Sequence, residues 1–68
     1  MGKAGEAISE YKRVIKDNPD HGNAYNNLGC VYVELKDYET AEKYWREGLR
    51  VDPGNKHIIL NLRANSGL

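Results

Sequence analysis

The sequence predicts an all-α fold of four helices arranged as antiparallel helix-turn-helix repeats. Apolar residues recur at intervals of three and four in four segments, and no stretch of strand length alternates apolar and polar residues. Two prolines, Pro19 and Pro53, each close one of these segments, and half the length of the chain separates them. We refer to this separation as the repeat interval. An offset of about 34 residues is typical of repeat proteins in which each unit is a pair of helices.

The composition limits the classes of function. A chain of 68 residues is near the lower limit for a single core without a metal or disulfide. The ten basic and ten acidic residues are intermixed, so we expect no binding to nucleic acid or to an anionic membrane. The single cysteine, Cys30, cannot form an intramolecular disulfide, which favours a reducing compartment such as the cytoplasm. Apolar runs are short, so neither a signal peptide nor a membrane span is expected.

The first two helices are expected over residues 3–17 and 22–35. Pro19 ends the first, because proline disfavours α geometry in the residue before it. Asp20 or His21 lies where the second needs an N-cap. The stripes that identify the two helices are Ala4, Ala7, Ile8, Tyr11, Val14 and Ile15 in the first and Ala24, Tyr25, Leu28, Val31, Tyr32 and Leu35 in the second.

The third helix is expected over residues 38–51, with Asp37 as its N-cap. Its outer face carries charged pairs in the favourable acid-first order, such as Glu42 with Arg46, which indicates a solvated surface. Its apolar stripe is Tyr38, Ala41, Trp45, Gly48 and Leu49.

The fourth helix is expected to begin near Lys56, with Asn55 as its N-cap. Its apolar residues Ile58, Ile59 and Leu62 lie together. Polar residues follow them, so this helix is expected to fray near Asn65.

The central pair of segments carries residues at a characteristic spacing: Tyr25, Leu28-Gly29, Tyr32, Ala41, Trp45 and Pro53. This spacing resembles the tetratricopeptide repeat, and the match covers residues 22–55. The resemblance implies helical pairs stacked as a short right-handed solenoid. Gly29 and Ala41 would lie where two helices approach too closely for larger side chains. Gly48 would allow close packing of the following helix, and the wider gaps would be filled by Tyr25, Tyr32, Tyr38 and Trp45.

A shift by one repeat interval assigns the two flanks. Residues 1–21 align with the second half of a preceding repeat, and residues 56–68 with the first or capping helix of a following one. Arg63 falls on Gly29 in this alignment and would clash with a close partner helix. The fourth helix is therefore expected to be a solvating cap, and the two outer helices are expected to expose apolar edges.

The resemblance implies a non-enzymatic module that binds an extended peptide or a helix in a concave groove. Asparagine amides in such a groove can pair with a peptide backbone without selecting its side chains. The competing interpretation is that these asparagines are caps or solvated residues. The expected lining residues are Asn23, Asn26, Asn27, Cys30, Val33 and Glu34 from the second helix and His57, Leu60, Asn61 and Ala64 from the fourth.

Two further interaction modes are conceivable for a chain with this resemblance. Some family members clamp a terminal carboxylate with lysine, arginine and asparagine. Asn27 fits the asparagine position, but His57 and Asn61 stand where basic residues are expected, so a carboxylate clamp is not expected. The second mode is self-assembly, in which the first helix of one copy covers the fourth helix of another to give a dimer or a head-to-tail stack. Arg63 argues against stacking of the kind seen between ordinary repeats.

No residue constellation predicts catalysis, a cofactor or a metal. Cys30 has no histidine at helical spacing to activate it, so a small packing residue is expected rather than a nucleophile. His21 and His57 together supply only two metal ligands. Without strands there is no glycine-rich phosphate loop. Tyr44 lies outside the apolar stripe and is expected either to be exposed or to pack along its own helix.

Overall fold

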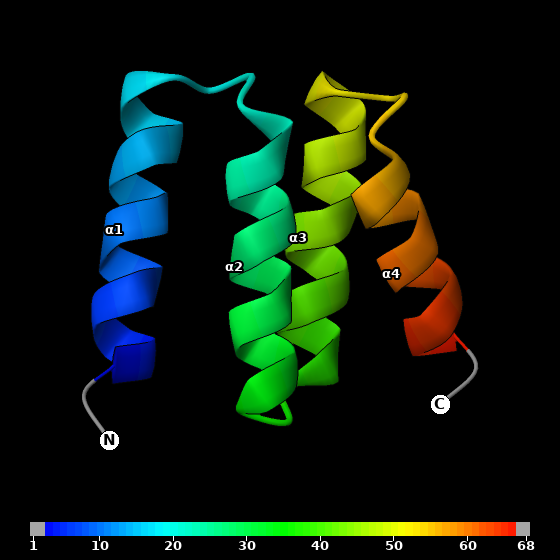
Figure 1. Ribbon diagram of the computed structural model, residues 1–68, viewed down its shortest axis with the longest axis horizontal. Helices are drawn as coiled ribbons and strands as arrows, with labels where there is room; N and C mark the ends of the chain where they lie inside the picture. Colours follow the sequence, from blue (N-terminus) through cyan, green and yellow to red (C-terminus); the bar gives the residue numbers. More distant parts are fainter. Residues whose placement is uncertain (1–2, 67–68) are drawn as a thin grey trace.

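The computed structural model describes residues 3–66, which form α1 (Lys3–Asp17), α2 (Gly22–Glu34), α3 (Tyr38–Val51) and α4 (Lys56–Ser66). Successive helices run antiparallel, with α1 and α4 at opposite edges of the array (Figure 1). The array is flat, with extents of 29 × 27 × 14 Å. The all-α prediction with four helices is confirmed for these residues, while the right-handed turn of a solenoid stays a prediction.

Side-chain caps begin the last three helices. The His21 Nδ1 accepts a hydrogen bond from the Ala24 amide at 3.3 Å, and Asp37 Oδ1 accepts one from the Thr40 amide at 3.3 Å. Asn55 Oδ1 accepts one from the Ile58 amide at 3.1 Å. These bonds satisfy amides that have no partner within the helix. The caps predicted at Asp37 and Asn55 are confirmed, and of the two candidates before α2 the cap is His21.

The turn between α2 and α3 is made by a residue in the left-handed conformation. Lys36 has φ 62°, its amide donates to the Val33 carbonyl at 2.9 Å, and the Asp37 amide donates to the Tyr32 carbonyl at 2.9 Å. This pair of bonds is the Schellman arrangement that closes helix C-termini, usually with glycine at this position. It ends α2 at Glu34, one residue before the predicted end.

The core lies between α2 and α3 and continues to α4. Leu28, Ala41 and Ile58 are fully buried, and Trp45 is 3% exposed. Gly29 lets α3 approach, because a Cβ at this position would overlap the Trp45 indole. The indole Nε1 donates to the Asn26 carbonyl oxygen at 3.1 Å. The close approach predicted at Gly29 and Ala41 is confirmed.

Three helices meet at Gly48. A Cβ at Gly48 would lie 2.6 Å from Ile58 Cδ1 and 2.7 Å from Tyr25 Cβ. Neither neighbour is at a free surface, so only glycine fits without a shift of α2 or α4. The prediction that Gly48 allows close packing of the following helix is confirmed.

The edges of the array differ from its centre. In α1 no residue is fully buried, and in α4 Leu60 is 61% exposed. The predicted apolar edges are thus present in the described residues. None of the helices described is both long enough and apolar enough to span a bilayer.

Two tyrosines on α3, Tyr38 and Tyr44, do not lie where the sequence predicted. Tyr38 is 41% exposed, so the prediction that it fills a gap between helices is wrong. It is the first residue of α3 and lies next to the turn between α2 and α3. Tyr44 stacks on Tyr32 with ring centroids 5.5 Å apart, so it packs across to α2 and is not an exposed aromatic.

Candidate functional site

An amide contact joins α2 and α4 along the predicted groove. Asn61 Nδ2 donates to Asn26 Oδ1 at 2.6 Å and lies 3.6 Å from Cys30 Sγ. Asn26 and Cys30 share one face of α2, because they are one helical turn apart. Three of the predicted groove residues are thus brought together from two helices, and we refer to Asn26, Cys30 and Asn61 as the amide seam.

A second amide contact lies at the start of the same two helices. Asn55 Nδ2 donates to Asn23 Oδ1 at 3.0 Å and to Asp52 Oδ2 at 3.0 Å, while its Oδ1 caps α4. The sequence identified Asn55 only as a cap. Its second role was hidden, because the partner Asn23 is distant in the sequence and the contact depends on how α2 and α4 pack. Asn23 and Asn26 on α2 are therefore each held in place by an asparagine from the α4 side, Asn55 and Asn61 respectively.

A small pocket of about 170 Å³ opens beside the amide seam. One of its lining residues is Asn65, whose Oδ1 is buried and has no hydrogen-bond partner among the described residues. Buried acceptors are normally satisfied, so this oxygen is an exception among the described residues. Two of its lining residues were not predicted to lie in the groove: Trp45, which was assigned to the core, and Asn65. The lining residues are Val33, Trp45, Asn61, Ala64 and Asn65.

Val33 and Ala64, two more of the predicted groove residues, line this pocket, but four others do not join the cluster. Glu34, His57 and Leu60 are exposed, and Asn27 is half-buried on α2. Within residues 3–66, no group of three His, Cys, Asp or Glu side chains is placed to hold a metal ion. The residues that converge are therefore amides and apolar groups, which suit hydrogen bonding and packing.

Burial raises the pKa of the Cys30 thiol, and the nearby Glu34 carboxylate raises it further. The hydrogen bond from Asn61 opposes this by favouring the thiolate. The net effect keeps the thiol protonated at neutral pH. Because the pKa of Cys30 is raised in the folded state, folding is favoured while the thiol is protonated. This contribution of Cys30 to the free energy of unfolding is fully present below the unfolded-state pKa and is lost as pH rises through the folded-state pKa.

We expect Cys30 to be alkylated by iodoacetamide with a pH midpoint above about 8.5, the ordinary value for cysteine. The rate is measured by mass spectrometry in buffer and in urea, where the unfolded chain supplies the reference midpoint. Glu34→Gln is expected to lower the folded-state midpoint, because it removes a negative charge that disfavours the thiolate. A folded-state midpoint equal to that of the unfolded chain would contradict this environment.

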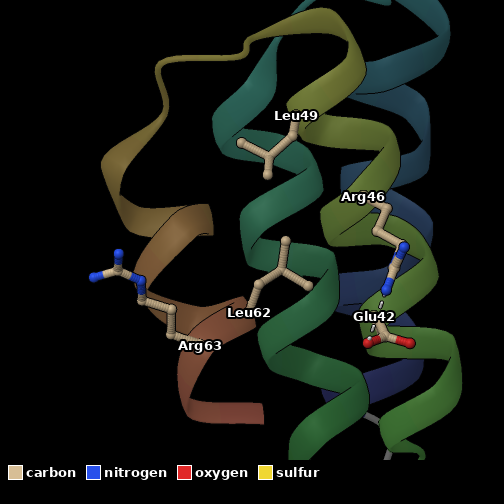
Figure 2. Close-up of a pocket in the computed structure, with 5 residues that line it drawn as sticks. All are labelled: Glu42, Arg46, Leu49, Leu62 and Arg63. Atoms are coloured by element: carbon tan, nitrogen blue, oxygen red, sulfur yellow. Dashed lines mark hydrogen bonds and ion pairs between the residues drawn. The ribbon is translucent and has the colours of Figure 1, made fainter. Parts of the chain in front are cut away.

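A larger pocket of about 380 Å³ lies between α3 and α4. Leu49 and Leu62 point into the space between the two helices, while Arg63 extends away from α3 (Figure 2). Glu42 and Arg46 form an ion pair at 3.5 Å along α3. Sequence reasoning did not identify this pocket, although it marked Arg63 as unsuited to a close partner helix. We refer to this space as the α3–α4 pocket. Its lining residues are Glu42, Arg46, Leu49, Leu62 and Arg63.

Comparison with known proteins gives several matches. Human tetratricopeptide repeat protein 6 is 31% identical over 61 residues, which is 90% of this chain and 12% of that protein. Heat shock protein STI1 of Saccharomyces cerevisiae is 32% identical over 56 residues, covering 82% of this chain and 10% of that protein. The Hsp70-Hsp90 organising protein of Plasmodium falciparum is 33% identical over 58 residues, covering 85% and 23%.

This chain spans less than a quarter of the length of each of these relatives. No solved structure gives a significant match. A family model described as tetratricopeptide repeat matches residues 22–55, and another described as TPR repeat matches residues 1–36. Each of these matches covers half of the chain or more, so the chain belongs to the tetratricopeptide repeat family.

Proposed function

We propose that this chain is a non-enzymatic protein-interaction module that holds an extended peptide in the groove between α2 and α4. The observation that carries the proposal is the amide seam beside the pocket at Trp45 and Asn65. In this proposal residues 22–55 are one complete repeat, residues 1–21 and 56–68 are the adjoining halves of its neighbours, and the module acts in the cytoplasm.

The seam leaves one donor and one acceptor for a peptide. Asn26 uses its Oδ1 and Asn61 its Nδ2 in their mutual bond. The Asn26 Nδ2 and the Asn61 Oδ1 have no hydrogen-bond partner among residues 3–66. A peptide unit offers the complementary C=O and N–H, so it can pair with both amides at once. The pocket beside them would take a small apolar side chain.

The partner class follows from the relatives and from the charges. Two of the relatives are named for heat shock or for organising Hsp70 and Hsp90, so a protein partner fits the family. Neither His57 nor Asn61 supplies the permanent positive charge that a terminal carboxylate would need. We therefore propose that the groove takes an internal peptide segment and needs no cofactor.

We expect Asn26→Ala combined with Asn61→Ala to weaken peptide binding about tenfold, because two hydrogen bonds to the peptide unit are lost. The probe is an array of blocked peptides of about eight residues with neutral ends, and affinities of the peptides that bind are measured by fluorescence anisotropy. The matched control is Asn18→Ala, which removes an exposed asparagine outside the groove. Circular dichroism checks that each variant is folded.

Two outcomes would contradict the groove proposal. The first is that no peptide in the array binds the wild-type chain. The second is that the double variant, although folded, binds as tightly as Asn18→Ala does.

Self-association is a second candidate function, favoured by the apolar edges that α1 and α4 expose. It uses different surfaces from the groove, so the two functions are compatible.

A further inference from the structure

The α1 helix presents a surface that is buried at the equivalent place on α3. Ala7 and Tyr11 stand one repeat interval before Ala41 and Trp45. Ala41 is fully buried and Trp45 is 3% exposed, because both pack against α2. Ala7 and Tyr11 are only half-buried. The difference indicates that this face of α1 is ready to cover another helix in the way that α3 covers α2.

The α4 helix presents the matching surface. Leu62 stands one repeat interval after Leu28, which is fully buried on α2. Leu62 is only half-buried and lines the α3–α4 pocket beside Leu49 (Figure 2). The apolar surface formed by Leu49 and Leu62 suits the side chains of an amphipathic helix. Leu62 also packs against the core residues Ala41, Trp45 and Ile58, and among the described residues α4 lies at the edge of the array (Figure 1).

These two surfaces cannot meet within one molecule, because α1 and α4 lie at opposite edges of the array (Figure 1). We propose that the α3–α4 pocket binds α1 of a second copy of this chain. This inference rests on the self-association proposed above and names its two surfaces. The contact would repeat between molecules the arrangement that α2 and α3 have within one.

The side chains that differ between the two arrangements are mutually complementary. Arg63 replaces Gly29, and on the covering helix Tyr11 replaces Trp45. At Gly29 the space next to the backbone is filled by the Trp45 indole. The smaller ring of Tyr11 leaves room for the Arg63 stem, and a guanidinium stacks favourably on an aromatic face.

The charges are complementary as well. Glu10 stands one repeat interval before Tyr44, and Tyr44 stacks on Tyr32 of α2. Tyr32 in turn lies three positions after Gly29, the residue that Arg63 replaces. Glu10 would therefore lie about one helical turn from Arg63, within reach of its long side chain. Both are exposed, and neither forms an ion pair among residues 3–66. The residue that prevents ordinary repeat stacking thus becomes the residue that selects this partner helix.

The contact joins two different surfaces, so it is heterologous. A heterologous contact leaves one free surface at each end, and further copies can add head to tail. The average size of the particles should therefore increase steadily with concentration.

The test is sedimentation velocity of the chain from about 10 µM to about 1 mM. The wild-type average mass is expected to rise over this range. Arg63→Glu and Glu10→Arg are each expected to weaken the association about tenfold, because each places like charges across the contact. A mixture of these two variants is expected to associate as the wild type does, because opposite charges then face each other wherever one variant meets the other.

The matched controls are Lys43→Glu and Glu39→Arg on the exposed outer face of α3, which are expected to associate as the wild type does. A wild-type chain that stays monomeric overturns both self-association and this site. Association that neither reversal weakens, or that mixing does not restore, overturns this site alone. Peptide binding by the Arg63→Glu chain tests the groove independently, since Arg63 lines a different pocket.

Discussion

Gly29→Ala is expected to destabilise the folded chain by about 3 kcal/mol, although alanine normally stabilises a helix relative to glycine by about 1 kcal/mol. The added Cβ would overlap the Trp45 indole. The indole cannot easily withdraw, because it is 3% exposed and its Nε1 is hydrogen-bonded to the Asn26 carbonyl at 3.1 Å. The free energy of unfolding is measured by urea titration, followed by circular dichroism.

Gly5→Ala is the matched control, because it makes the same change in a helix where a Cβ would meet nothing within 4 Å. It is expected to increase the free energy of unfolding by about 0.5 kcal/mol, through the lower helix propensity of glycine. If Gly29→Ala stabilises the chain as Gly5→Ala does, the close approach of α2 and α3 is contradicted.

A loss of this size matters in a small domain. A chain of 68 residues is expected to have a free energy of unfolding between about 3 and about 10 kcal/mol. A destabilisation of about 3 kcal/mol would leave a large share of the molecules unfolded at the lower end of that range. At that lower end, the single contact between Gly29 and Trp45 would decide whether the α2–α3 pair forms.

This contact could be predicted from the sequence, because residue size at a fixed spacing reports how closely two helices pack. Gly29 and Ala41 are small where their neighbours in the stripe are large, and both lie where α2 meets α3. Helix boundaries were predictable for a similar reason, since caps such as Asp37 act over three residues. Local spacing is enough for features of this kind.

The amide seam could be predicted only in part. The repeat spacing placed Asn26 and Asn61 on the same groove, but their hydrogen bond depends on rotamers and on the offset of α4 along α2. The Schellman turn that ends α2 one residue before the predicted end was not foreseen, for another reason. The left-handed φ of 62° at Lys36 is usually adopted by glycine, so the sequence offers no signal for a Schellman turn at this lysine.

The α3–α4 pocket was missed because no local pattern encodes it. It is a gap left where α4 has no covering helix, and it becomes visible only when the burial of Leu62 is compared with that of Leu28. The sequence did mark Arg63 as a misfit. That misfit indicated that α4 does not pack as α2 does, and the structure shows that Arg63 lines the α3–α4 pocket.

Trp45→Ala is expected to reduce the free energy of unfolding by about 4 kcal/mol, the largest effect of any single truncation proposed for this chain. The change removes the aromatic side chain between α2 and α3, leaves a cavity, and takes the hydrogen-bond donor from the Asn26 carbonyl. Tyr38→Ala is the control, because Tyr38 is an aromatic residue on the same helix that is 41% exposed. Urea unfolding followed by circular dichroism should show a loss below about 1 kcal/mol for the control.

Trp45→Phe separates packing from hydrogen bonding, because it keeps an aromatic ring and removes the Nε1 donor. It is expected to cost about 2 kcal/mol, combining an unsatisfied Asn26 carbonyl with a smaller ring. Trp45 also lines the groove pocket, so this variant, where it remains folded, is expected to bind peptide more weakly. Equal losses for Trp45→Ala and Tyr38→Ala would contradict the role of Trp45 in the core. Unchanged peptide affinity in a folded Trp45→Phe chain would instead show that the pocket beside the amide seam does not contact the peptide.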